Sequence, residues 1–107
     1  MQFLVLTEQS SAPPPEMVLP LISAMEAWVA RYRAAGKVRH SWSFAGSQGG
    51  GGVVEVDSPE ELDVIMAGFP FGPFSTIKVY ALSDLDQSLA ALRTAVQQTM
   101  EMMGAKP

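Results

Sequence analysis

The sequence predicts a single α+β domain, and two observations support this prediction. The chain has 107 residues, a length that suits one hydrophobic core and leaves no room for a separate cofactor domain. Short β-rich runs and helical patterns follow in the order strand, helix, strand, strand, helix, strand, helix. Because no internal repeat or linker interrupts this order, we expect one domain over residues 1–107.

The first strand and the first helix occupy the first third of the chain. Residues 2–7 (QFLVLT) are a β-rich run that ends at the loop EQSSAPPP, whose prolines forbid regular strand pairing. Apolar residues at helical spacing then predict a helix from about Pro15 to Ala35, capped by Gly36. The start of this helix is left open, because Pro20 suits only the first turn.

In the segment KVRHSWSFA, residues 37–45, apolar or aromatic side chains alternate with polar ones, which predicts the second strand. Strict alternation divides its side chains between the two faces of the strand. One set is Val38, His40, Trp42 and Phe44, and the other is Lys37, Arg39, Ser41 and Ser43. The glycines of GSQGGGG, residues 46–52, break this pattern, so we expect a flexible hairpin connection before the third strand, VVEVD.

A second helix and a fourth strand follow. Ser58 before PEELDVIM predicts a helix over residues 59–66, because serine is a favoured N-cap and Pro59 suits the first helical position. Glu61 stands where a capping-box partner belongs. Residues 75–82 (STIKVYAL) then predict the fourth strand, after the segment GFPFGPF.

The last predicted helix begins at Ser83 or Asp84 and ends at Gly104. Its apolar residues form a narrow stripe of Leu85, Leu89, Leu92, Val96, Met100 and Met103. The order β-α-β-β-α-β plus a C-terminal helix is the ferredoxin-like split βαβ pattern. In this fold the helices cover one face of the sheet and leave the other face open. Because the strands are apolar on both faces, the open face is apolar too, and we expect two sheets to pack face to face in a homodimer or a higher homo-oligomer.

Composition excludes several classes of partner. A formal net charge of −4 provides no basic field for phosphates, so we expect no nucleic-acid partner and no membrane partner. No run approaches the length of a membrane span, and MQFLVLTEQ has the character of a strand rather than a signal peptide, so we expect a cytoplasmic protein. Without cysteine and with one histidine, the chain predicts no metal site.

Three motifs together resemble the muconolactone isomerases of the dimeric α/β-barrel superfamily. They are RHSWSFAG, VVEVDSPEEL and FPFGPFSTIKVYAL, and their spacing fits that family without gaps from Arg39 to Leu82. The family pattern has RH-x-W-R-x-AG, then V-x-D-V-x-S-x-E-x-L, then L-P-L-x-P. This chain departs from it at Ser43, where the family has arginine, and in the hairpin, where SQGGGG replaces histidine and tyrosine.

The resemblance implies a small enzyme that works without a cofactor. A base removes a proton from an activated carbon and an acid returns it to another carbon, so that a double bond moves in a small unsaturated lactone. A cyclase that acts on an aromatic or polyketide-derived molecule is the same kind of catalyst. The alternatives are a cofactor-free monooxygenase of the same fold and a non-catalytic module for ligand binding or dimerisation.

Three residues are candidate acid–base groups. His40 is a candidate because imidazole is the side chain most often used as a general acid or base, although a single histidine on a strand is often structural. Glu26 lies at the edge of the first helix's apolar stripe, where a carboxylate gains basicity if it is desolvated, but such residues are often solvated. Tyr32 is a candidate hydrogen-bond donor to an enolate, or a boundary tyrosine with its hydroxyl in water.

Aromatic residues and one arginine are candidate substrate contacts. Trp42 suits stacking on a planar ligand, and Arg39 has the planar fork that suits a carboxylate. Alternation places Arg39 and His40 on opposite faces of the strand. The sequence does not decide which of these two residues points into a pocket. The further predicted contacts are Trp28, Phe71 and Phe74.

Overall fold

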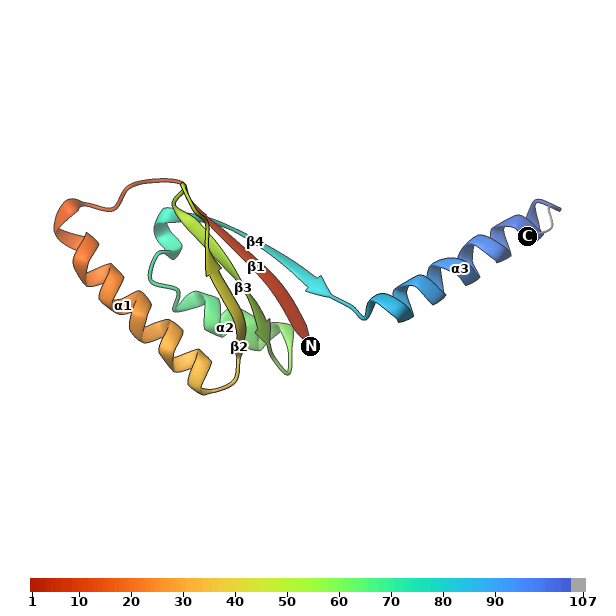
Figure 1. Cartoon of the computed structure of the whole chain (residues 1–107), viewed down its shortest axis with the longest axis horizontal. Coiled ribbons are helices and arrows are strands. Elements are labelled where there is room, and N and C mark those ends of the chain that lie inside the picture. Colours follow the sequence, from red (N-terminus) through yellow and green to blue (C-terminus); the bar gives the residue numbers. More distant parts are fainter. Residues whose placement is uncertain (105–107) are drawn as a thin grey trace.

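The computed structural model of the protein describes residues 1–104 and contains one antiparallel four-stranded sheet (Figure 1). The elements are β1 (Gln2–Gln9), α1 (Pro15–Ala34), β2 (Val38–Ser43), β3 (Gly49–Glu55), α2 (Pro59–Ala67), the 3-10 turn η1 (Gly72–Phe74), β4 (Ser75–Leu82) and α3 (Leu85–Met102). The sheet order is β2-β3-β1-β4. The predicted ferredoxin-like α+β fold with a C-terminal helix is therefore confirmed. The single domain over residues 1–107 stays a prediction, and residues 105–107 lie outside the described residues.

The hydrophobic core lies between one face of the sheet and the helices α1 and α2 (Figure 1). Its buried side chains are Phe3, Val5, Val54, Val56, Leu62, Ile65 and Phe69. Trp28 of α1 packs against this core, and its Nε1 donates a hydrogen bond of 3.2 Å to the carbonyl oxygen of Ile65 on α2. Pro20 lies inside α1 rather than in its first turn, at an exposed position.

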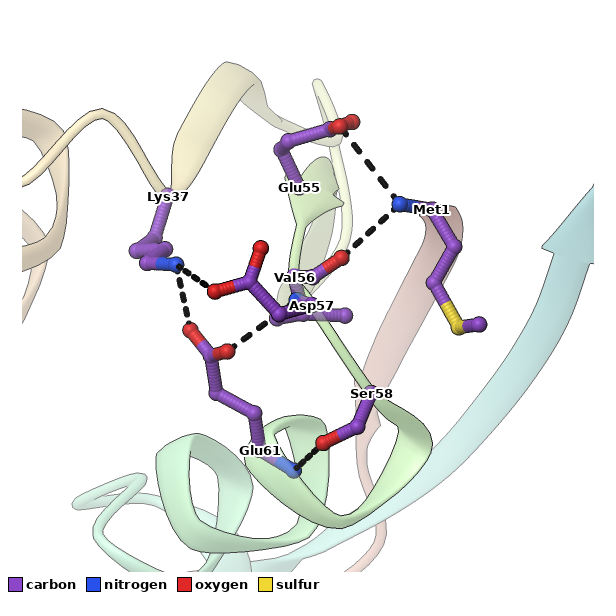
Figure 2. Close-up of polar contacts among 7 residues, drawn as sticks. All are labelled: Met1, Lys37, Glu55, Val56, Asp57, Ser58 and Glu61. Carbon is purple, nitrogen blue, oxygen red and sulfur yellow. Dashed lines mark hydrogen bonds and ion pairs between the residues drawn. The ribbon is translucent and has the colours of Figure 1, made fainter.

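A polar cluster fixes the start of α2 (Figure 2). The backbone N–H of Glu61 donates to Oγ of Ser58 at 3.2 Å, which is the predicted serine N-cap. The Glu61 carboxylate accepts a hydrogen bond from the backbone N–H of Asp57 and pairs with Nζ of Lys37, which also pairs with Asp57. These contacts join β2, β3 and α2 at one end of the sheet.

The four consecutive glycines form part of β3, and the prediction of a flexible connection was therefore wrong. Gly50 pairs with Thr7 of β1 and with Ser43 of β2, so the run lies between two strands. A Cβ atom on Gly49 or Gly50 would collide with a carbonyl oxygen of the neighbouring strand. Glycine is required here by the close approach of backbones rather than by mobility.

The predicted faces of β2 were also wrong at one point, because the strand is bulged. The pairing with β3 shifts register between Val38 and His40, which leaves Arg39 as the extra residue. Val38 consequently lies opposite Val54 on the covered face of the sheet, whereas His40 lies opposite Val53 on the open face.

The helix α3 extends away from the rest of the molecule as an arm (Figure 1). The Cα radius of gyration is 19.3 Å, whereas a compact chain of this length has about 13 Å. None of its residues is buried, and Leu85 and Leu92 on its predicted stripe are 69% and 60% exposed. We refer to residues 1–82 as the body, which contains the sheet and the core.

Candidate active site

A cavity of about 410 Å³ lies between α1 and the covered face of the sheet. From α1 it is lined by Met25, Trp28, Val29 and Arg33. From the strands it is lined by Val5, Thr7, Gln9, Val38, Ser41, Trp42, Ser43, Gly49, Gly50, Gly51, Gly52 and Val54. Gln48, Met66, Phe69, Phe71 and Ser75 complete the lining. A volume of this size suits a small organic molecule.

One part of the cavity wall is apolar and aromatic. The rings of Trp28 and Phe69 lie 5.3 Å apart between centroids at a tilted angle, and Phe71 follows Phe69 by two residues. The hydrogen bond from Trp28 to α2 fixes the orientation of the indole. This part of the wall presents flat apolar surfaces to a ligand, and its aromatic side chains are not acid–base groups.

Another part of the cavity wall is polar and includes Arg33, which is exposed. Its Nη2 donates a hydrogen bond of 2.6 Å to Oγ of Ser41 on β2. Ser43 and Gln48 add neutral polar groups to the cavity lining. Among the described residues, Arg33 is the one ionisable side chain in the cavity lining. The cavity therefore combines an apolar body with one positive charge.

The floor of the cavity is formed by glycine backbone. Gly52 lies opposite Val5 and Ser41, and Gly50 lies opposite Thr7 and Ser43, so both glycines are on the covered face. A Cβ atom on Gly50 would collide with the carbonyl oxygen of Trp42, and one on Gly52 would lie 2.9 Å from the carbonyl oxygen of His40. The close approach of β2 therefore requires glycine here, and the glycine run leaves bare backbone in the cavity lining.

The structure brings three of the predicted site residues to the cavity. They are Trp28, Trp42 and Phe71. The arginine position of the resembled motif, Ser43, lines it as well. Trp42, however, pairs with Gly51 and its ring lies over Gly51 on the open face of the sheet, so Trp28 and Phe71 supply the aromatic side chains.

The other predicted residues do not line this cavity. His40 is exposed on the open face of the sheet, Arg39 is exposed in the bulge, and Glu26 is exposed on α1. Tyr32 packs beside Trp28 with ring centroids 5.5 Å apart, and Phe74 belongs to η1. Their proposed roles stay predictions, and the single chain does not gather them around the cavity.

Sequence reasoning did not name Arg33, a charged helix residue that is exposed in the structure and also lines the cavity. The pattern that identifies it is spacing: Met25, Val29 and Arg33 recur every four residues and so share one face of α1. Ser41 was assigned to the face opposite His40, which the structure bears out.

Metal-ligand clusters and membrane-spanning helices are both absent from residues 1–104. No group of three His, Cys, Asp or Glu side chains there is placed to hold a metal ion. None of the helices described is both long and apolar enough to cross a membrane.

Comparisons with known proteins agree with this architecture. The family model described as muconolactone delta-isomerase matches residues 1–88. A muconolactone Δ-isomerase from Acinetobacter baylyi is 31% identical over 70 residues, which covers 65% of this chain and 73% of that protein. A crystal structure of muconolactone isomerase superposes with a TM-score of 0.69 at 26% identity, over 78% of this chain and 90% of that one.

A second solved structure resembles the chain in fold. It is a 5-chloro-2-hydroxyhydroquinone dehydrochlorinase from Burkholderia phenoliruptrix in complex with 2,5-dihydroxybenzoquinone, with a TM-score of 0.62 at 17% identity over 81% of this chain and 98% of that one. The family match covers the whole body, including the motifs on β2, β3 and β4, and stops within the first turn of α3. On this match and the muconolactone isomerase similarities, the chain belongs to the muconolactone delta-isomerase family.

Proposed function

We propose that the protein is a cofactor-free isomerase or cyclase that moves protons on a small unsaturated lactone or a related ring. The observation that carries the proposal is the cavity, which joins an aromatic wall, a glycine floor and one guanidinium in a member of this family. Family membership supports catalysis on a small molecule. The cavity supports a flat ligand of limited size.

Proton transfer requires a base and an acid within reach of the ligand. The acid–base residues that we propose are His40, Glu26 and Tyr32. The support for His40 is its place in the RHSWSFAG motif, which lies within the family match. Tyr32 packs beside the cavity residue Trp28, and Glu26 lies on α1, the helix that lines the cavity.

The reaction is tested with muconolactone as the probe, in heavy water, followed by NMR. The expected result is migration of the ring double bond together with incorporation of deuterium at the carbon that gains the proton. Consumption of oxygen during turnover would instead favour the monooxygenase. Binding without double-bond migration or deuterium exchange would contradict the proposal for this substrate.

The acid–base residues are tested by His40→Ala, Glu26→Gln and Tyr32→Phe. A general acid or base contributes about 10²- to 10⁴-fold, so we expect kcat to fall by that order in a variant that removes one. If all three variants keep the wild-type kcat, the acid–base assignment is wrong even though the chain is an enzyme.

A non-catalytic ligand-binding module is the second candidate, and one observation favours it. No imidazole or carboxylate is found among the described residues that line the cavity. Such a module would bind the probe in the cavity and leave it unchanged, which the NMR experiment detects directly.

We propose that the protein works as a homodimer through the open face of the sheet. Trp42, Tyr80 and Leu82 of this face are 42%, 50% and 42% exposed, which is unusual for large apolar side chains that share one surface. In sedimentation velocity, Tyr80→Lys should shift the protein toward monomer. Val64→Lys on α2, at a 70% exposed position outside this face, is the matched control. A wild-type monomer at assay concentration would contradict the dimer.

A further inference from the structure

One side of α3 has the residue spacing of a coiled-coil seam. Its positions recur at alternating intervals of four and three residues, and all of them are exposed: Leu85, Leu89, Leu92, Val96, Thr99 and Met103. We refer to these six positions as the seam. The one hydroxyl among them, on Thr99, donates to the carbonyl oxygen of Ala95 at 3.0 Å, so it is satisfied within its own helix. A repeat of this period keeps an apolar stripe facing one partner helix.

The body does not cover the seam. No residue of α3 is buried, and the helix extends away from the body (Figure 1). The accessible surface of the chain is 7579 Å², whereas a compact protein of 11.5 kDa exposes about 5800 Å². This excess is larger than the roughly 800 Å² that each partner buries in an interface of standard size. The arm therefore has enough area for a stable interface with another chain.

Two opposite charges lie on one flank of the seam. Asp86 and Arg93 are seven residues apart, which places them on the same side of the helix and about 10.5 Å apart along its axis. Neither forms an ion pair within residues 1–104, where the cations of the ion pairs are the Met1 N-terminus and Lys37. A partner helix that carries the same two charges in reverse order complements this flank.

A second copy of α3 in antiparallel orientation has these charges in reverse order. When Leu89 lies opposite Leu92 of the other copy, and Leu85 lies opposite Val96, the apolar positions of the two seams meet in layers. In this register the acidic residue of each flank lies beside the arginine of the other copy, and two-fold symmetry forms that ion pair twice. In a parallel pair the charged flank instead meets the opposite flank of the partner, which has no charge: Ser88, Ala95 and Met102.

We propose that α3 forms an antiparallel two-helix coiled coil with α3 of a second copy of this chain, in which Asp86 of each copy pairs with Arg93 of the other. This interface goes beyond the proposed function, because it involves neither the cavity nor the open face of the sheet. The family match stops at residue 88, so most of the interface lies in a segment that the family match does not cover.

The orientation is tested with two single-cysteine variants, because the chain has no cysteine of its own. Leu85→Cys and Val96→Cys are mixed in a glutathione redox buffer, and the disulfide-linked products are identified by non-reducing intact-mass spectrometry. A disulfide requires α-carbons within about 7 Å. In the antiparallel pair these two positions face each other, whereas each lies about 16 Å along the axis from its own copy. We therefore expect the mixed disulfide and neither self-disulfide.

The ion pair is tested on the yield of the same disulfide. Arg93→Asp and Asp86→Arg should each lower the yield roughly threefold or more, because both symmetric ion pairs become repulsive. The double variant Asp86→Arg/Arg93→Asp should restore the yield. Glu101→Lys is the matched control: it changes the net charge as Asp86→Arg does, on the side of α3 away from the seam, and should leave the yield unchanged.

Several results would overturn the coiled coil. Self-disulfides without the mixed product would show a parallel pair, and all three products in statistical ratio would show random collision. Absence of any disulfide would show that the seam is not buried between copies. A double variant that is no better than the single variants, or an equal loss in Glu101→Lys, would reject the ion pair that sets the register.

Discussion

The body and the helix α3 follow the same local rules but differ completely in burial. Both α2 and α3 begin with a side-chain cap, Ser58 for α2 and Asp84 for α3. Yet α2 buries Leu62 and Ile65 in the core, whereas α3 buries no residue. Local sequence is thus sufficient to specify a helix, and a separate condition decides whether that helix is packed.

The difference matters because isolated helices of this length are marginally stable in water. The 18 residues of α3 have a stripe of apolar side chains and no contact surface in their own chain. We therefore expect α3 to be less stable than the body unless contacts outside the described chain cover its stripe. The family match ends at residue 88, so it includes the whole body and only the first turn of α3.

The largest expected effect contrasts a core residue with a residue on the α3 stripe. Ile65 is 2% exposed, and Ile65→Ala should lower the free energy of unfolding by about 2–5 kcal/mol because it leaves a cavity. Leu92 is 60% exposed, and Leu92→Ala should change it by less than about 0.5 kcal/mol. Urea denaturation followed by circular dichroism, at a concentration where the chain is monomeric, measures both values.

The same two variants, measured over a range of protein concentrations, test whether the α3 stripe is buried between copies of the chain. If the cost of Leu92→Ala rises with concentration while that of Ile65→Ala stays constant, the stripe is buried between copies. A cost of Leu92→Ala that equals that of Ile65→Ala in the monomer would show that α3 packs on its own body.

An intermediate effect is expected from the two helix caps. Ser58→Ala removes the acceptor for the Glu61 N–H and should lower the free energy of unfolding by about 1 kcal/mol. Asp84→Ala removes the acceptor for the Gln87 N–H, 2.9 Å away, at the start of a helix that the body does not need. We expect it to leave the unfolding midpoint unchanged and to speed amide exchange at Gln87. A lower midpoint in Asp84→Ala would mean that α3 and the body unfold together.

Much of the body could be predicted because its boundaries are marked by local chemistry. The Ser58 cap with Pro59 located α2, and the fourth strand was predicted with the bounds that β4 has. The face of His40 relative to Val38 could not be predicted, since a bulge depends on pairing with β3 rather than on the residues of β2. The glycines of β3 were misassigned for the same reason.

The candidate site was predictable only where residue type alone suggests a role. Trp28 and Phe71, which were named as substrate contacts, line the cavity, and their contact with a substrate stays a prediction. Arg33 was missed because its hydrogen bond to Ser41 joins α1 to β2, a tertiary contact that the sequence pattern does not show. A single sequence does not show which side chains meet through tertiary contacts.

The smallest expected effect comes from the ion pair at the start of α2, and within residues 1–104 no such pair is found at the start of α3. Hydrogen bonds from Lys37 and from the Asp57 N–H hold the pKa of Glu61 below its ordinary value of 4.5. The hydrogen bond with Glu61 is also the main reason that the pKa of Lys37 is raised above 10.5.

These shifts set the direction of the pH dependence. A carboxyl with a lowered pKa stabilises the fold fully above its unfolded-state pKa, and this contribution is lost as pH falls through the lower folded-state value. The contribution of Lys37 is complete below 10.5 and is lost as pH rises through its raised pKa. Glu61→Gln should therefore be less stable than wild type at neutral pH and should converge with it in acid. Glu60→Gln removes an equal charge from the same turn, outside the Lys37 contact, and should not converge in this way. A constant difference between Glu61→Gln and wild type down to the lowest pH would show that the ion pair does not stabilise the body.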